Sequence, residues 1–300
     1  MVGSGKSLDY KTLLLQAILS KKELQAVDLS FAKHELDAFL VRDTAARKYL
    51  TSKTISSRSG EFKRIVKAVR AQLRRAHSLF EMGNSSEEYL RFVNSLEKAK
   101  NWKQLVSLST EVLAGHRSSE ERFSDYTLLY LWIGKTIGEV KSILDLGCGL
   151  HPVSICFLQK KDLVGMKYLA FDINKSEQEI LNLFFSKVAL FVDDFSGLAE
   201  MMNLRSAGVL DRLNSIKTVD LVFMLKLSDH LDRGKGHKAT EKVLLALKTK
   251  YVLLSFPTIT RSGAPMRYPK RRWVEYLCAR LDYSFESMQT KNELFYLIQK

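Results

Sequence analysis

The spacing of apolar residues divides the chain into two parts with different periodicities. Up to residue 112, apolar positions recur three and four residues apart, as in amphipathic helices that each bury one face. The clearest example predicts one helix whose apolar stripe comprises Phe62, Val66, Val69, Leu73, Ala76 and Phe80. We therefore expect residues 1–112 to form an all-helical domain.

Beyond residue 126, short apolar runs alternate with helical stretches. Buried strands are predicted at 140–146, 167–173, 188–194, 220–226 and 251–256, with a closing strand at 292–300. Helices are predicted at 126–134, 176–187, 240–249 and 271–281. Strands that alternate with helices are typical of a mostly parallel, doubly wound sheet. We assign residues 113–300 to this second, α/β domain.

Positive charge changes this picture, because it is concentrated in the helical part. The chain has 47 Lys and Arg against 33 Asp and Glu, a formal charge of +14. Between Arg42 and Arg75, eleven basic residues accompany two acidic ones. Four of them follow the apolar stripe one residue later, about 100° around the helix: Lys63, Lys67, Arg70 and Arg74. A one-sided basic face favours a polyanionic partner such as nucleic acid, although a merely solvated face has the same pattern.

The same composition argues against several other classes of protein. No apolar run approaches the roughly 18 residues of a membrane span, and the N-terminus has no signal-peptide cleavage site. The three cysteines are Cys148, Cys156 and Cys278, a number and spacing that indicate neither disulfides nor a metal site. We expect a cytoplasmic protein without metal.

A glycine turn follows the first predicted strand, in the sequence ILDLGCG (143–149). It contains Asp145, Gly147 and Gly149, and ligands of open parallel sheets bind beyond such strand ends. Asp172 lies 23 residues after Gly149, near the spacing at which a second-strand carboxylate binds a ribose. Asp194 and Phe195 follow the predicted third strand, where they would meet an adenine edge. Together these residues predict an adenosine pocket, with a ligand-free turn as the alternative.

The residues after the turn discriminate between adenosine cofactors. A dinucleotide site needs a third glycine, but Leu150, His151 and Pro152 follow Gly149. An acid just before the glycines would repel a diphosphate, whereas it suits the ammonium and sulfonium groups of S-adenosylmethionine (SAM). The turn therefore favours SAM as the cofactor.

Motifs along nearly the whole chain resemble one methyltransferase family. They are ILSKKELQAV (18–27), VKAVRAQLRRAH (66–77), HRSSEERF (116–123), ILDLGCGLHP, FDI, VDDF, FMLKLSDHLDR, VLLSFPT and ELFYLI. They resemble the aminoglycoside-resistance 16S ribosomal RNA methyltransferases of the Arm/Rmt group, which methylate N7 of guanine-1405 in the decoding site. The resemblance implies a Rossmann-like class I SAM-dependent methyltransferase domain preceded by a helical RNA-binding domain, and potentially antibiotic resistance.

The resemblance also implies roles for single residues. Arg122 would clamp the SAM carboxylate, or else form an ordinary helix ion pair with Glu121 or Asp125. In the cofactor pocket, the implied contacts are Asp172 with the ribose, Ile173 with adenine, and Asp194 and Phe195 with the adenine edge. Lys226 would face the methyl-transfer centre or the RNA, unless it is simply solvated. His151 departs from the family, which usually has Asn before the proline, and the loop 260–272 differs as well.

Methylation of guanine N7 needs no general base, because that nitrogen carries a lone pair and no proton. The target base must leave its stack, so folded RNA has to be held by its phosphates. Candidates for the phosphate contacts are Lys21, Lys22, Lys63, Lys67, Arg70, Arg74, Arg75, Arg271 and Arg272. We expect a monomer that acts on the 30S subunit. Methylation of another nucleotide (adenine N1 in the same helix, or tRNA) and a non-catalytic role in ribosome assembly remain open.

Overall fold

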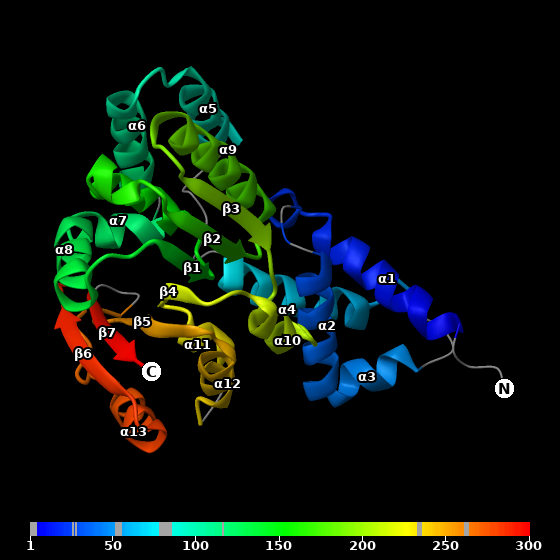
Figure 1. The fold of residues 1–300 in the computed structure, drawn as a ribbon. Helices are drawn as coiled ribbons and strands as arrows, with labels where there is room; N and C mark the ends of the chain where they lie inside the picture. The colour runs from blue at the N-terminus through cyan, green and yellow to red at the C-terminus, as the bar shows by residue number, and fades with distance from the viewer. Residues whose placement is uncertain are drawn as a thin grey trace. The chain divides into compact units, whose positions relative to one another are not determined.

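The computed structural model divides the chain into two compact units. It describes residues 5–25, 27, 29–51, 56–77, 86–115, 117–232, 236–260 and 264–300. The first unit comprises Met1–Leu79 with Ile173–Lys175, and the second comprises Phe80–Asp172 with Ser176–Lys300. Figure 1 shows the helices of the first unit and the sheet of the second.

The first unit is helical, as predicted. Its elements are α1 (Gly5–Leu19), the 3₁₀ helix η1 (Lys22–Leu24), α2 (Leu29–Arg42), α3 (Thr44–Leu50) and α4 (Gly60–His77). The apolar stripe of α4 is confirmed for Phe62, Val66, Val69 and Leu73, which are all buried in one core with residues of α1 and α2. The side chain of Ala76 and the whole of Phe80 lie outside the described residues.

Among the described residues of the second unit, four helices precede a seven-stranded sheet. The helices are α5 (Ser86–Lys98), α6 (Trp102–Gly115), α7 (Arg117–Phe123) and α8 (Tyr126–Ile137). The strands are β1 (Ser142–Leu146), β2 (Lys167–Asp172), β3 (Ser196–Met201), β4 (Val219–Leu225), β5 (Thr249–Pro257), β6 (Ser284–Gln289) and β7 (Glu293–Gln299). Their order is β3-β2-β1-β4-β5-β7-β6, with β7 antiparallel to both of its neighbours. The predicted mostly parallel, doubly wound sheet is confirmed.

Both faces of the sheet are covered, so its central strands are apolar on both sides. Ile143 of β1 packs in a cluster with residues of α5, α6, α8 and α9 (Lys175–Phe191). Leu144, the next residue, packs on the opposite face with α10 (Val209–Ser215), α12 (Lys238–Ala246) and α13 (Arg272–Leu281). The remaining short helices are η2 (His151–Phe157), η3 (Lys160–Leu163) and α11 (Ser228–Leu231).

Helix α5 and most of α6 lie before the predicted boundary at residue 112, yet both helices pack with the sheet. Phe92 and Leu96 of α5 and Leu105 and Leu113 of α6 belong to the same core cluster as Tyr126 of α8. By contacts these two helices are therefore part of the second unit. The functional division into an RNA-binding region 1–112 and a methyltransferase region 113–300 stays a prediction.

The strand predicted at 188–194 is wrong. Helix α9 continues to Phe191, because Phe184, Phe185, Val188 and Val192 follow a helical period and are all buried. A short apolar run at the end of a helix cannot be distinguished from a strand by hydrophobicity alone. The third strand begins later, at Ser196.

Gly197 lies where β3 passes the ring of Phe185, and this close approach predicts that a larger residue at position 197 destabilises the fold. A Cβ atom at this position would overlap the ring. We expect Gly197→Ala to lower the free energy of unfolding by about 1–3 kcal/mol, the usual cost of overpacking. Thermal denaturation measures the change. In the matched variant Gly134→Ala, the new Cβ in α8 has nothing within 4 Å, and we expect unchanged or slightly higher stability. Equal destabilisation of the two variants would contradict this close approach.

Candidate cofactor site and nucleic-acid interface

The strand order reverses at β1, which is the position where open α/β sheets bind ligands. β1 pairs with β2 on one side and with β4 on the other. The crevice beyond the carboxyl ends of such strands is a ligand-binding place. The glycine turn follows β1 directly, and Lys226 follows β4. The structure thus brings two of the predicted site segments to the same edge of the sheet.

The two glycines of the turn are required by its backbone. Gly147 has φ 64° and Gly149 has φ 51°, in the left-handed region that favours glycine. The N–H of Gly147 donates to the carbonyl of Phe171 at 2.8 Å, and a Cβ on Gly147 would lie 2.8 Å from Leu227. The N–H of Gly149 donates to the Asp172 carboxylate at 2.9 Å. The turn therefore joins the end of β1 to the end of β2 through bare backbone.

Asp145 is buried beneath this turn and has side-chain partners that the sequence pattern did not indicate. Its Oδ2 accepts from the Tyr168 hydroxyl at 2.9 Å and lies 2.7 Å from Nδ1 of His151. Burial and the charge of Asp145 raise the pKa of Tyr168 well above its usual value, so this hydroxyl stays a donor. With 1 % of its surface exposed, Asp145 supports the turn from inside. Its contact with a cofactor stays a prediction.

Asp172 is the last residue of β2 and lies at the expected edge. It is buried, and its Oδ2 accepts the N–H of Gly149, as described above. Ile173, the next residue, belongs to the first unit and packs against the core of that unit. The predicted contacts of Asp172 with a ribose and of Ile173 with adenine stay predictions.

The prediction that Asp194 and Phe195 read an adenine edge is wrong, because both precede β3. Ser196 at the start of β3 pairs with Lys167 at the start of β2, whereas Asp172 pairs with Met201. The two residues therefore lie at the amino ends of the strands, opposite the glycine turn. Asp194 is exposed, and the ring of Phe195 is buried 6.1 Å from that of Phe185. The residues beyond the carboxyl end of β3 are instead Met202 and Asn203. They were not among the predicted site residues because the third strand was predicted at 188–194.

Arg122 and Lys226 meet at a carboxylate that the sequence pattern did not identify, Glu293 of β7. The buried Arg122 donates from Nε to Glu293 Oε2 at 2.7 Å, so neither Glu121 nor Asp125 is its partner. Lys226 has a φ of 51°, a strained value for a residue with a side chain, and its N–H donates to Ser255 Oγ at 3.0 Å. Its Nζ forms an ion pair with Glu121 and lies 3.5 Å from Glu293 Oε2.

Unpaired polar atoms along this edge fit a polar ligand. Within the described residues, the buried atoms without a hydrogen-bond partner include Asn203 Nδ2, Ser228 Oγ and Glu293 Oε1. Asn203 follows β3, Ser228 follows β4, and Glu293 pairs with Pro257 at the end of β5. Buried polar groups normally have partners, so these donors and acceptors are suited to the hydroxyl and amino-acid groups of a nucleoside cofactor.

The basic stripe of α4 is confirmed as an accessible face, with one exception. Lys63, Lys67 and Arg74 are exposed, and neither lysine forms an ion pair with any described residue. Arg70 is half-buried and donates to the carbonyls of Ala17 and Ile18 and to Ser20 Oγ. It therefore caps the carboxyl end of α1, where unpaired carbonyls favour a cation.

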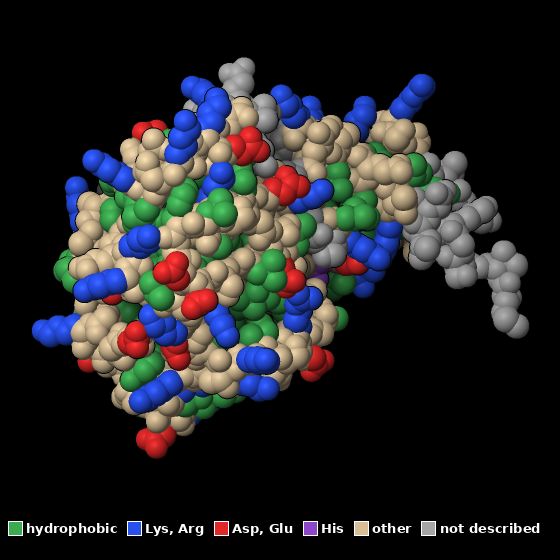
Figure 2. Space-filling model, turned by 45° about the horizontal axis from the view of Figure 1, so that its top comes forward, with side chains coloured by type: hydrophobic (Ala, Val, Ile, Leu, Met, Phe, Trp, Pro, Cys, Tyr) green, Lys and Arg blue, Asp and Glu red, His purple; other side chains and the backbone are tan. Residues whose placement is uncertain are grey.

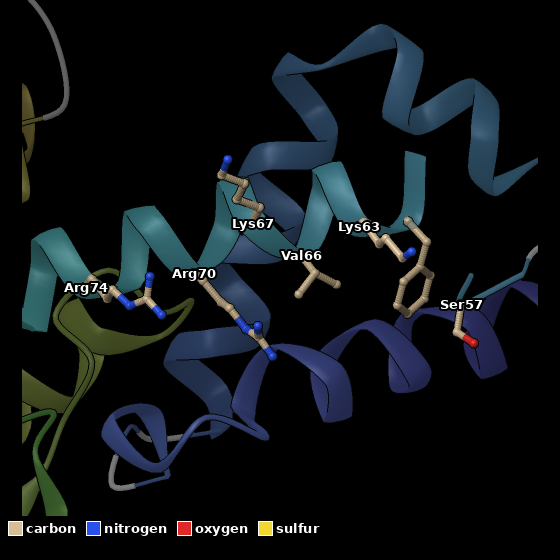
Figure 3. A pocket seen from close by; sticks show the side chains of 7 residues that line it. Ser57, Lys63, Val66, Lys67, Arg70 and Arg74 are labelled. Atoms are coloured by element: carbon tan, nitrogen blue, oxygen red, sulfur yellow. The ribbon is translucent and has the colours of Figure 1, made fainter. Parts of the chain in front are cut away.

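A pocket of about 240 Å³ opens on this face. Its lining residues are Ser57, Phe62, Lys63, Val66, Lys67, Arg70 and Arg74 (Figure 3). Figure 3 shows Arg70 directed from α4 towards α1, whereas the amino group of Lys67 points to the other side of the helix. The pocket thus combines the apolar side chains of Phe62 and Val66 with cationic ones, and phosphate binding there stays a prediction. Lys21 and Lys22 are exposed at η1, and the side chain of Arg75 lies outside the described residues.

Of the two arginines predicted near the chain's end to bind RNA, one has an internal role. Arg271 donates to the carbonyls of Pro269 at 2.9 Å and Tyr268 at 3.2 Å, and its guanidinium lies 5.3 Å from the ring centre of Phe256. It therefore holds its own loop in place. Arg272 begins α13 and is exposed. Other Lys and Arg side chains are spread over the face shown in Figure 2.

No described helix is long and apolar enough to cross a membrane. No group of three or more His, Cys, Asp or Glu in the described ranges is placed to hold a metal ion.

Comparisons with known proteins agree with this geometry. The model of the family "Ribosomal RNA methyltransferase (FmrO)" matches residues 41–297. The chain is 26% identical over 202 residues to the 16S rRNA (guanine(1405)-N(7))-methyltransferase of Proteus mirabilis, which covers 66% of this chain and 67% of that enzyme. Among solved structures, the 16S rRNA methyltransferase RmtF in complex with S-adenosyl-L-homocysteine has a TM-score of 0.72 at 19% identity and covers 99% of both chains. An rRNA methylase from Escherichia coli has a TM-score of 0.68 at 18% identity, with 97% of this chain and 99% of that chain covered.

Proposed function

The chain belongs to the FmrO family of ribosomal RNA methyltransferases, and on this basis we propose that it methylates N7 of a decoding-site guanine in 16S rRNA, with SAM as donor. The relative from Proteus mirabilis, which acts on guanine-1405, supports the choice of nucleotide. We further propose that the modification protects the ribosome against aminoglycosides. The protein would act as a monomer in the cytoplasm on the 30S subunit.

The observation that carries the proposal is the cradle at the reversal of strand order. Here the left-handed turn at Gly147 and Gly149 presents bare backbone beside the carboxylate of Asp172. The unpaired atoms of Asn203, Ser228 and Glu293 lie along the same edge. In this cradle Asp172 would bind the ribose and Arg122 the carboxylate of SAM, while Asp145 holds the turn from below.

The chain's own residues position the reactants rather than transfer protons. SAM supplies an electrophilic methyl group on its sulfonium, and guanine N7 attacks with its lone pair. No proton leaves the base, so the rate depends on alignment of the two reactants. Lys226, fixed between Glu121 and Glu293 at the end of β4, would face the reacting base or its phosphate. The exposed cations of α4, together with Lys21, Lys22 and Arg272, would hold the RNA backbone.

The proposal is tested by incubating 30S subunits with SAM and mapping the methylated nucleotide of 16S rRNA by mass spectrometry. We expect one methyl group on N7 of guanine-1405. A methyl group on adenine N1 of the same helix, or on tRNA offered in parallel, would overturn the nucleotide assignment. If the protein neither methylated RNA nor bound S-adenosylhomocysteine, the proposal that it is an enzyme would be overturned. A role as a ribosome-assembly factor would then be favoured.

A further inference from the structure

We propose that Glu293 is a positioning residue of the cofactor site, which orients Arg122 and Lys226 from the last strand of the sheet. The inference rests on the proposed function, because it concerns the same site. Glu293 acts through its neighbours: it sets where the guanidinium of Arg122 and the ammonium of Lys226 are presented.

The geometry around Glu293 joins three elements that are distant in the sequence. A single oxygen, Oε2, accepts from Arg122 Nε at 2.7 Å and lies 3.5 Å from Lys226 Nζ. Arg122 belongs to α7, Lys226 follows β4, and Glu293 begins β7. A guanidinium is planar, so pairing at Nε fixes its plane. The edge between its two terminal nitrogens then faces a different direction, where it would bind a ligand carboxylate.

The backbone around Glu293 is itself held in place. Asn292 donates from Nδ2 to the carbonyl of Glu121 at 3.0 Å, and its own carbonyl accepts from the N–H of Thr258 at 3.0 Å. Glu293 then pairs with Pro257 in the β5–β7 ladder. Two consecutive residues thus bind α7: Asn292 contacts the backbone of Glu121, and Glu293 contacts the side chain of Arg122. This rigid support distinguishes Glu293 from a surface counterion.

The electrostatics keep the group charged. The Glu293 side chain is fully buried, and burial alone would raise its pKa. The charges of Arg122 and Lys226 outweigh burial and hold that pKa below its usual value. Burial alone would also lower the pKa of Arg122, but the charge of Glu293 raises it. At neutral pH both partners are therefore ionised.

The second oxygen of Glu293 indicates more than structural pairing. Oε1 forms no hydrogen bond within the described residues, although the hydroxyl of Ser255 is near enough to help lower the pKa of the carboxyl. A buried acceptor without a donor is unfavourable, so an ion pair that only stabilised the fold would be expected to satisfy both oxygens. An unsatisfied oxygen beside two oriented cations is typical of a site that is completed by its ligand.

The test is calorimetric titration of Glu293→Gln with S-adenosylhomocysteine. Gln keeps the shape and removes the charge that orients Arg122. We expect the affinity to fall about tenfold, as is usual when the support of a binding group is removed, while affinity for 30S subunits is unchanged. In kinetics, the KM for SAM rises and the KM for 30S does not. Unchanged affinity for S-adenosylhomocysteine would overturn the inference.

Two further variants keep the test decisive. Glu293→Gln leaves Arg122 and Lys226 without their buried countercharge, so its folding is checked by thermal denaturation. If Glu293→Gln does not fold, Glu293→Asp is tested instead, because Asp keeps the charge but its shorter side chain withdraws the carboxylate from Arg122. Wild-type affinity of Glu293→Asp for S-adenosylhomocysteine would overturn the inference. Glu241→Gln, which breaks the surface pair with Arg280 at 2.8 Å, is the matched control with unchanged affinity. Failure of the wild type to bind S-adenosylhomocysteine would instead refute the proposed function.

Discussion

Replacement of Asp172 by Ala weakens the binding of S-adenosylhomocysteine by about a hundredfold or more, the largest effect that we expect at a single position. The carboxylate ends β2 beside the glycine turn, where it would accept both hydroxyl groups of the ribose. Each hydrogen bond to a charged group contributes about 1.5–3 kcal/mol, so losing two has this effect. The change also removes the acceptor of the Gly149 N–H, which loosens the turn in the same direction.

Asp194→Ala is the matched control for that experiment. It removes the same side chain from the amino ends of the strands, where Ser196 pairs with Lys167. We expect affinity within about twofold of wild type, measured by the same calorimetric titration with thermal denaturation as a check of folding. If Asp194→Ala abolished binding, the assignment of the strand ends would be wrong. If Asp172→Ala bound normally, the cofactor would bind elsewhere.

Charge reversal on α4 has the second large effect. In Lys63→Glu/Lys67→Glu/Arg74→Glu, three exposed cations that would contact RNA phosphates become anions. We expect affinity for 30S subunits to fall about a hundredfold at low salt. The slope of log affinity against log salt should fall by about 0.7 for each RNA phosphate that the protein no longer neutralises. Binding of S-adenosylhomocysteine should be unchanged. Filter binding at several salt concentrations measures the affinity for 30S subunits and its salt dependence. Calorimetry measures the binding of S-adenosylhomocysteine. Arg70 is left in place because it caps α1.

A variant with the same change in net charge separates a local effect from a general one. Lys160, Lys161 and Lys248 are exposed and precede β2 or β5, at the amino ends of the strands. Reversing these three should weaken 30S binding much less than reversing the α4 residues. Equal losses would mean that total charge, and not the α4 face, determines RNA affinity. Equal losses of 30S and cofactor binding in the α4 variant would argue against separate functional regions.

The two strands that the hydrophobic pattern did not predict are both edge strands of the sheet. β3 pairs only with β2, and β6 pairs only with β7. An edge strand buries less of its surface, and the sequences SGLAEM and SFESMQ are mostly exposed or half-buried. They consequently lack the apolar run that marked β1, β2, β4, β5 and β7. The missed β3 explains why Asp194 and Phe195 were placed at the wrong edge.

The sequence by itself determined the features that arise from neighbouring residues. A helical period separates the core stripe of α4 from its basic face, and apolar runs mark the central strands. The glycine turn likewise shows where backbone must be bare. Each of these depends on contacts within a few residues, which local periodicity encodes.

Only the tertiary structure decided which charges meet. Arg122 pairs with Glu293, 171 residues away, and not with the acids beside it. Asp145 is turned inward to Tyr168 and His151. Arg70 caps α1, although its position in the basic stripe predicted a contact with an RNA phosphate. A buried charge takes whichever partner the packing of distant strands and helices brings within hydrogen-bond range. That choice depends on strand order and register, which no local pattern of residues contains.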